Sequence, residues 1–214
     1  MKLSEHPLLF GGQKLLLNNQ RTIYWPRENV LILSDLHLGK AAHFRKHGIA
    51  LPTTVSEHDL FRLQQLLVHY HPGQMIIVGD LVHAGANKEV ESFRSLALQF
   101  PETCFSLIRG NHDRYAPKKL NELGITHYYD TLQLQNIHFS HYPVQSEIPT
   151  ISGHTHPGVS IRMPHGKYLR FPCFALAGNL LILPAFSLFT GLDTHSLPEN
   201  TVCYAIHEDG IFIV

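Results

Sequence analysis

Three short apolar runs constrain the fold of this chain more than any other feature. They are NVLILSD, MIIVGD and CFSLIRGN, which begin at residues 29, 75 and 104. None of them alternates apolar with polar residues, and a continuous run of this length is typical of a strand that is buried on both faces. The segments between the runs have helical periodicity. This β-α-β order predicts a parallel sheet that is covered by helices.

Two helices are predicted between the runs. The first begins at Thr54, which has capping-box spacing to Glu57, and the second is capped by Asn87. Their apolar stripes are Leu60, Leu63, Leu67 and Tyr70 in the first, and Val90, Phe93, Ala97 and Phe100 in the second.

Strands dominate the rest of the chain. Residues 15–25 read as two strands around an Asn-Asn turn, and from residue 137 onward short strands alternate with turn signals. We therefore predict an α/β protein with a four-layer αββα sandwich, in which helices flank two mixed β-sheets. With 214 residues and no linker-like segment, residues 1–214 are expected to form a single domain.

The composition limits the kinds of partner. Seventeen Lys and Arg balance seventeen Asp and Glu, so the chain lacks the basic excess of constitutive nucleic-acid or membrane binders. No stretch approaches the ~18 apolar residues of a membrane span, which predicts a cytoplasmic protein. Cys104, Cys173 and Cys203 are widely spaced, lie mostly inside apolar runs and are expected to be reduced thiols in the core. Seventeen histidines invite a metal hypothesis that only their spacing can test.

Polar residues gather where the predicted strands end. The motifs are DLH (35–37), GD (79–80), GNHD (110–113), SHYP (140–143) and GHTH (153–156). In open α/β sheets ligands bind beyond the carboxyl ends of the strands, so these motifs are expected to converge on one site. Carboxylate, amide and imidazole ligands without a thiolate suit Mn²⁺, Fe²⁺ or Zn²⁺. Each motif alone is weak evidence, but five in this order predict a metal centre.

This set of motifs resembles the calcineurin-like metallophosphoesterase superfamily, whose pattern is D-x-H, GD, GNH-[DE], H and GH-x-H. The resemblance implies two divalent metal ions that share a bridging hydroxide as the nucleophile for phosphodiester hydrolysis. It assigns Asp35, His37, Asp80 and His156 to one metal. It assigns Asp80, Asn111, His141 and His154 to the other, with Asp80 as the bridge.

His112 is the predicted general acid at the leaving group. Adjacent side chains of an extended segment point to opposite sides, so Asn111 turns to metal and leaves His112 free to face the substrate. A histidine in this role needs its other ring nitrogen held by a partner. His83 is the predicted partner, because it stands where related protein phosphatases have a supporting Asp. Asp113 is expected to be a structural hydrogen-bond acceptor.

A narrower resemblance rests on SDLHLGKAAHFRKHGIALP, RGNHDR, SGHTHPG, LRFPCFAL and LPAFSLFTG. These segments are similar to the bacterial ligase-associated DNA damage response endonucleases. Membership would imply a manganese-favouring enzyme that acts on DNA in repair, with an ATP-dependent DNA ligase, a helicase and a nuclease-like protein as partners. The chain departs from that family at residues 191–200, where a single Gly191 precedes LDTHSLPEN.

Substrate contacts are harder to predict from the sequence. The candidates are Arg45, Arg109, Arg114 and His43. For each of them the simpler interpretation is a solvent-exposed side chain that does not contact substrate. The aromatic residues of the segment LRFPCFAL are expected to pack in the core rather than to form a surface on which bases stack. The neutral net charge predicts weak affinity for bare DNA, and hence recruitment by partner proteins.

Two alternatives remain open. A UDP-2,3-diacylglucosamine pyrophosphohydrolase also carries a DLHL motif, but it usually has an acidic residue at the position of His83 and needs a lipid-accepting insertion. A non-catalytic scaffold of the same fold typically loses catalytic residues, whereas this chain keeps them all.

Overall fold

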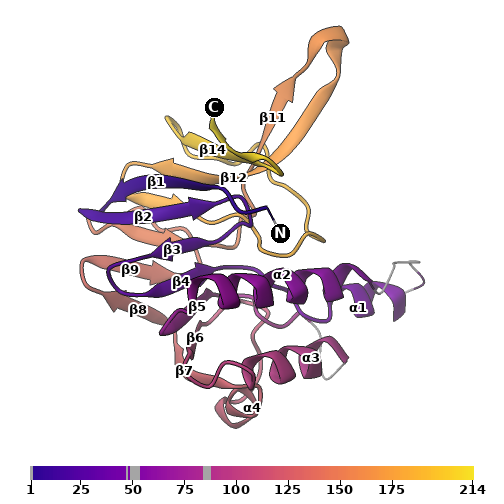
Figure 1. The fold of residues 1–214 in the computed structure, drawn as a ribbon. Helices are drawn as coiled ribbons and strands as arrows, with labels where there is room; N and C mark the ends of the chain where they lie inside the picture. Colours follow the sequence, from indigo (N-terminus) through magenta and orange to yellow (C-terminus); the bar gives the residue numbers. More distant parts are fainter. Residues whose placement is uncertain (1, 47, 49–53, 84–87) are drawn as a thin grey trace.

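The computed structural model describes residues 2–46, 48, 54–83 and 88–214, and its two β-sheets lie face to face (Figure 1). The first sheet follows the chain order from β1 to β7. Its strands are β1 (Glu5–Phe10), β2 (Gln13–Asn18), β3 (Ile23–Trp25), β4 (Val30–Leu33), β5 (Gln74–Val78), β6 (Cys104–Ile108) and β7 (Ile125–Tyr129). Pairing is antiparallel from β1 to β4 and parallel from β4 to β7. The three apolar runs thus form the parallel half of this sheet, as predicted.

The second sheet has the order β15-β14-β12-β13-β10-β9-β8, and β11 extends from it by pairing with β12. Its strands are β8 (Thr131–Leu134), β9 (Ile137–Ser140), β10 (Thr150–Ser152), β11 (Gly158–Arg162), β12 (Tyr168–Ala177), β13 (Leu180–Ile182), β14 (Val202–His207) and β15 (Gly210–Ile213). The short segment β10 pairs in parallel with both β9 and β13. The other pairs are antiparallel, so both sheets are mixed.

The helices are α1 (Lys40–Lys46), α2 (Thr54–Tyr70), α3 (Lys88–Ala97) and α4 (Pro117–Glu122). The two predicted helices are confirmed as α2 and α3, whereas the short α1 and α4 were not predicted. Phe100 lies beyond the end of α3, so it packs against the core from a turn and not from the helix. The proposed cap Asn87 and the side chain of Thr54 lie outside the described part of the chain.

Alternation along the central strands creates two cores. In β4, Leu31 and Leu33 pack against the helices, while Val30 and Ile32 face the second sheet. Each fully buried aliphatic side chain contributes about 1.5–3 kcal/mol. Strands buried on both faces therefore hold the helical layer and the second sheet together, and they fix the position of the loops that follow them.

The predicted sandwich of two mixed sheets is confirmed, but the helices cover it on one side. Across the described residues, α1 to α4 belong to the first sheet's side (Figure 1). The outer face of the second sheet carries several small side chains, among them Cys173, Ala175 and Ala205, packed against Val159 and Leu197. Small side chains leave a shallow surface that a loop can cover. The chain after α4 also has no apolar stripe of helical period, so no fourth layer of helices forms there.

Two further predictions concern cysteines and membranes. Cys104, Cys173 and Cys203 are free thiols, as predicted, but only Cys173 and Cys203 are buried, whereas Cys104 is partly exposed. No helix within the described residues is long and apolar enough to cross a membrane. The prediction of a single domain over residues 1–214 stays a prediction.

Candidate metal centre

The motif residues occupy an unusual backbone conformation. Five of them have the left-handed φ that side chains other than glycine rarely adopt: Asp35 (56°), His37 (52°), Asp80 (53°), His154 (74°) and His156 (52°). Each such residue costs about 1–2 kcal/mol. Strain of this kind persists only where the surrounding structure imposes it, and it clusters at functional sites. The sharp turns bring side chains from different strand ends together.

Backbone hydrogen bonds continue the parallel sheet into these turns. The N–H of Asp35 donates to the Gly79 carbonyl (3.1 Å), and the N–H of His37 donates to the Asp80 carbonyl (2.9 Å). Leu38 then forms an isolated parallel bridge with Val82. The loops after β4 and β5 therefore run side by side, which fixes the first two motifs relative to each other.

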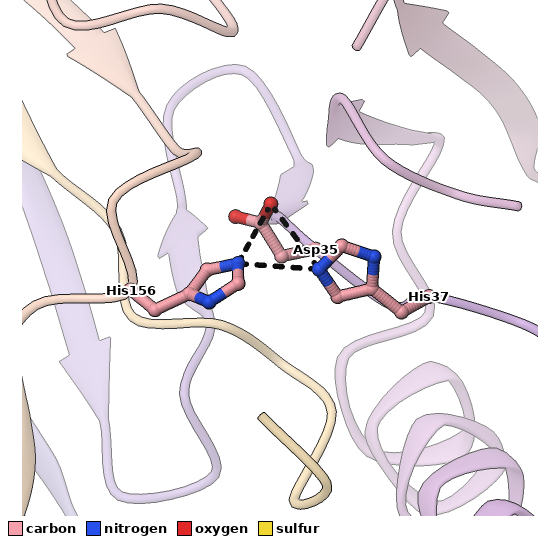
Figure 2. Close-up of side chains that lie close together, drawn as sticks. All are labelled: Asp35, His37 and His156. Carbon is pink, nitrogen blue, oxygen red and sulfur yellow. Dashed lines mark hydrogen bonds and ion pairs between the residues drawn. The ribbon is translucent and has the colours of Figure 1, made fainter. Parts of the chain in front are cut away.

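The first cluster consists of Asp35, His37 and His156, whose polar atoms converge on one point (Figure 2). The Nε2 atoms of His37 and His156 lie 3.2 Å apart. Asp35 Oδ1 lies 3.3 Å from His156 Nε2 and 3.8 Å from His37 Nε2. Two imidazoles and one carboxylate that face each other at these distances can hold a cation.

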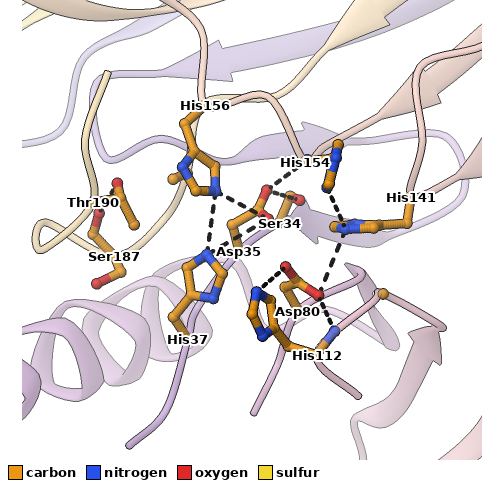
Figure 3. A network of polar contacts seen from close by, with 12 residues as sticks. Ser34, Asp35, His37, Asp80, His112, His141, His154, His156, Ser187 and Thr190 are labelled. Carbon is orange, nitrogen blue, oxygen red and sulfur yellow. Dashed lines mark hydrogen bonds and ion pairs between the residues drawn. The ribbon is translucent and has the colours of Figure 1, made fainter. Parts of the chain in front are cut away.

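The second cluster consists of Asp80, His141 and His154 (Figure 3). Asn111 lies beside it, against His141. His141 Nε2 lies 3.2 Å from His154 Nδ1, 3.2 Å from Asn111 Oδ1 and 3.6 Å from Asp80 Oδ1. The other nitrogen of His141 lies 3.0 Å from the Val78 carbonyl. Since a carbonyl only accepts, Nδ1 carries the proton and Nε2 presents its lone pair to the cluster.

The donor chemistry of the first cluster fits a divalent cation. Asp35 is fully buried, and among the described residues its Oδ1 accepts no hydrogen bond beyond its ion-pair contacts with the two histidines, while the buried His37 Nδ1 has no hydrogen-bond partner. Burial alone would raise the pKa of the Asp35 carboxyl, but His156, His141 and Ser34 outweigh it and hold that pKa below its usual value. Burial lowers the pKa of His37 to about 3. An ionised carboxylate beside a neutral imidazole is the state that binds metal.

Three motif glycines are required by the packing of this site. A Cβ at Gly79 would lie 2.0 Å from His141 Nδ1. A Cβ at Gly110 would lie 2.2 Å from Asp80 Oδ1, and one at Gly153 would lie 2.7 Å from Asp35 Oδ2. Real Cβ contacts are longer than 3.0 Å. The glycine of each GD, GN and GH motif therefore makes room for a polar side chain contributed by a neighbouring strand end.

His112 stands at the open side of the clusters. Its backbone N–H donates to Asp80 Oδ1 (3.0 Å), and its Nε2 lies 3.9 Å from Asp80 Oδ2. Its ring centroid is 5.6 Å from that of His37 and 4.4 Å from that of His83. The His83 and His112 rings are inclined at 36°, and no hydrogen bond joins them in the described structure. Burial, together with the nearby His112, lowers the pKa of His83 to about 4.

The backbone around Asn111 and His112 differs from the extended segment that we expected. β6 ends at Ile108, and the N–H of Asp113 closes a turn onto the Gly110 carbonyl (3.3 Å). The two side chains still diverge, because Asn111 lies against His141 while His112 lies against His83. The turn, and not strand alternation, separates them.

Asp113 has the structural role that was predicted. It is 5% exposed, its Oδ1 accepts the N–H of Val82 (3.0 Å), and its Oδ2 accepts the N–H of Gly110 (3.0 Å). Burial raises the pKa of this carboxyl. One side chain thus ties the turn after β6 to the loop after β5.

Three of the four candidate substrate residues have side chains that the structure describes. Arg109 and Arg114 line a cavity of about 600 Å³ that also reaches Asn111 and His141. The guanidinium of Arg109 lies over the Tyr128 ring, with its carbon 4.9 Å from the ring centroid, and pairs with Asp130 (3.3 Å). The His43 ring is 5.6 Å from that of His83. The side chain of Arg45, on α1, lies outside the described part of the chain.

Sequence reasoning missed other residues beside the clusters. Lys40, the first residue of α1, interacts electrostatically with Asp35 and Asp80, although burial has the larger effect and lowers its pKa. Ser34 Oγ contacts the Asp35 carboxylate and the Val78 carbonyl. Ser187 and Thr190 lie on the loop beside His37 and His156 (Figure 3). Lys40 follows DLHLG directly, and this closeness to the first motif is the only sequence feature that could have indicated its position beside the clusters.

Comparisons with known proteins agree with this geometry. The family model of the calcineurin-like phosphoesterases matches residues 28–181. Nuclease MPE from Pseudomonas putida is similar in structure, with a TM-score of 0.81 at 30% identity, over 94% of this chain and 96% of that chain. A protein of unknown function from Aquifex aeolicus gives a TM-score of 0.42 at 18% identity, over 59% of this chain and 78% of that chain, which is too low to indicate a common fold. No curated protein sequence matches the chain.

Proposed function

The chain belongs to the calcineurin-like phosphoesterase family and is a metal-dependent phosphoesterase, and from this premise we propose that it hydrolyses phosphodiester bonds in DNA. The observation that carries the proposal is the pair of neighbouring His/Asp clusters with His112 at their open side. The structural similarity to a nuclease over nearly the whole chain supports nucleic acid as the substrate class.

The two clusters are proposed to hold two divalent metal ions. Asp35, His37 and His156 would bind one, and Asn111, His141 and His154 the other, with Asp80 between them. We propose Mn²⁺ as the native metal, with Fe²⁺ or Zn²⁺ as alternatives, because imidazole, carboxylate and amide ligands without thiolate suit these ions. When bound, the metals would polarise the phosphoryl oxygens and activate the attacking water.

His112 is proposed to be the catalytic histidine that protonates the leaving oxygen. Its side chain is 36% exposed, whereas those of Asp80 and His141 beside it are almost fully buried. It therefore faces the space where a substrate would enter, next to both clusters. The hydrogen bond from its backbone N–H to Asp80 Oδ1 fixes the start of the side chain, and the ring Nε2 lies 3.9 Å from Asp80 Oδ2.

His83 is proposed to be a positioning residue for His112. Among the histidines that the structure describes, its ring is the nearest to that of His112, and its low pKa keeps it neutral at pH 7. A neutral neighbour does not repel the imidazolium that His112 must form. The tilted ring contact also limits the rotation of His112. The described structure shows no hydrogen bond of the kind predicted between the two rings, so the proposed role rests on the ring contact instead.

The biological setting is proposed from the narrower family resemblance. A role in DNA repair, in the cytoplasm, with an ATP-dependent DNA ligase, a helicase and a nuclease-like protein as partners, would follow from it. Arg109, Arg114, Arg45 and His43 stay substrate-binding candidates. Arg109 and Arg114 have the stronger case, because they line the cavity that reaches the second cluster.

The test compares two substrates. Wild type with Mn²⁺ is expected to cleave both bis-p-nitrophenyl phosphate and single-stranded DNA. His112→Ala is expected to lose DNA cleavage by about 10²–10⁴-fold but to lose far less on bis-p-nitrophenyl phosphate, whose good leaving group needs no proton. His83→Ala should weaken DNA cleavage while shifting its pH profile. Full DNA activity in His112→Ala would refute the role of His112.

The same assays separate the alternatives. A preference for UDP-2,3-diacylglucosamine over DNA would favour the pyrophosphohydrolase. Absence of bis-p-nitrophenyl phosphate hydrolysis in a protein shown to bind two Mn²⁺ would favour a non-catalytic scaffold.

A further inference from the structure

A β-hairpin projects from the second sheet beside the metal centre. It pairs β11 with β12 from Gly158 opposite Pro172 to Arg162 opposite Tyr168, and it extends away from the body of the protein (Figure 1). β11 begins two residues after His156. At about 3.3 Å per residue, its five residues span roughly 16 Å. We call residues 158–172 the arm.

The arm has an unbalanced charge. The chain has seventeen Asp and Glu, but none of them falls between Glu147 and Asp193, which leaves the whole arm without an acidic residue. Within it lie Arg162, Lys167 and Arg170. No ion pair in the described structure involves these three side chains, and all three residues are exposed. The arm is therefore positively charged, although the net charge of the whole protein is zero.

Strand alternation gives the arm two different faces. Directly opposed residues share a face, so Val159, Ile161, Leu169 and Phe171 form an apolar one. At its base the Phe171 ring contacts the Phe212 ring of β15, with centroids 5.5 Å apart. The opposite face carries Ser160, Arg162, Tyr168 and Arg170. Tyr168 is 62% exposed, so this face presents a free aromatic ring between two arginines.

The position of Gly158 shows where the basic face points. Gly158 lies on the same face of β11 as Ser160 and Arg162, because alternate residues of a strand share a face. A Cβ built on Gly158 would lie 2.9 Å from Leu192 Cβ. Its N–H donates to the Asp193 carbonyl (2.9 Å). The basic face is therefore turned toward the side of the 187–193 loop, whose Ser187 and Thr190 lie beside His37 and His156 (Figure 3).

We propose that the arm binds a single strand of the nucleic-acid substrate and guides it to the metal centre. Arginine pairs with phosphate oxygens through two parallel hydrogen bonds, and an exposed tyrosine stacks on an unpaired base. A base in a duplex is already stacked and unavailable to Tyr168, so the surface fits a single strand better than a duplex. This inference rests on the proposed function, since it assumes that nucleic acid is the substrate.

The test removes the charge of the arm and leaves the metal centre intact. The variant carries Arg162→Gln, Lys167→Gln and Arg170→Gln together, and its hydrolysis of bis-p-nitrophenyl phosphate is expected to stay within twofold of wild type. Its KM for single-stranded DNA should rise about tenfold or more. The slope of log KM against log salt should fall by roughly 2, because each phosphate contact on a single strand contributes about 0.7.

A matched variant controls for net charge. Lys14→Gln, Arg27→Gln and Lys118→Gln together remove three exposed cations from other parts of the surface. This control should keep the wild-type KM and salt slope. If it raises KM as much as the arm variant does, only net charge matters and the proposal is wrong.

Tyr168 tests the stacking step separately. Tyr168→Phe keeps the ring and should keep the KM for single-stranded DNA. Tyr168→Ser removes it and should raise that KM at least about fivefold. Binding of a fluorescent single strand to the metal-free protein should weaken in parallel, which reads out the contact without catalysis.

Two results would count against the inference in distinguishable ways. Wild-type KM and salt slope in the arm variant, with DNA cleavage intact in the wild type, would overturn the role of the arm alone. Hydrolysis of bis-p-nitrophenyl phosphate without any DNA cleavage by the wild type would instead overturn the proposed substrate, and the arm proposal with it.

Discussion

Gly110→Ala is expected to damage the metal centre by adding one methyl group. The new Cβ would lie 2.2 Å from Asp80 Oδ1 and 2.3 Å from the Asp80 backbone nitrogen, whereas ordinary contacts begin at 3.4 Å. The backbone atom decides the outcome, because a side-chain oxygen can rotate away but the backbone nitrogen cannot. The loop after β5 or the turn after β6 must therefore open by about 1 Å.

That displacement acts directly on the proposed chemistry. Asp80 belongs to the second cluster and accepts the N–H of His112, so both shift with it. A 1 Å misplacement of reacting groups costs about 10²-fold in rate. We therefore expect kcat/KM for bis-p-nitrophenyl phosphate to fall about 100-fold at saturating Mn²⁺, together with weaker Mn²⁺ binding by calorimetry.

Gly191→Ala is the matched control. Apart from its chain neighbours, no atom of the described residues lies within 4 Å of a Cβ built at Gly191, and its φ is not in the left-handed region. This variant should keep wild-type activity and gain slightly in stability, since alanine restricts the unfolded chain. If Gly110→Ala keeps kcat/KM within threefold of wild type, the packing argument for the motif glycines is wrong.

Three further predictions concern stability. Asp113→Ala should lower the free energy of unfolding in urea by about 3 kcal/mol, because it orphans two buried backbone N–H groups, while Asp130→Ala at an exposed site should change it little. His37 has a folded pKa of about 3, so the unfolded chain takes up its proton first and stability falls as pH drops below 6.5. Between pH 7 and 5 the metal-free wild type should lose about 2 kcal/mol more than His37→Asn, and equal losses would refute the buried neutral state. Arg62→Ala should cost about 3–5 kcal/mol by leaving the buried Asp59 unpaired, and a cost below 1 kcal/mol would contradict this.

The central strands and the order of the site motifs were predictable from local pattern. Continuous apolar runs such as VLIL and MIIV are compatible with few structures other than a doubly buried strand. The short helices were not predictable, because α1 and α4 have fewer than two turns and their stability comes from packing. The absence of helices, within the described residues, from the outer side of the second sheet was not predictable either, because the loop that covers this side has no sequence periodicity.

The sequence by itself determined which residue types end each strand, and hence which chemistry the site can perform. Only the tertiary structure decided how they meet. The left-handed turns at Asp35 and Asp80, the turn that separates Asn111 from His112, and the ring contact between His83 and His112 depend on contacts between distant segments. The two faces of the arm likewise follow from strand register. These contacts join residues that are far apart in the sequence, and they stabilise backbone conformations that are locally strained. No local sequence pattern encodes them.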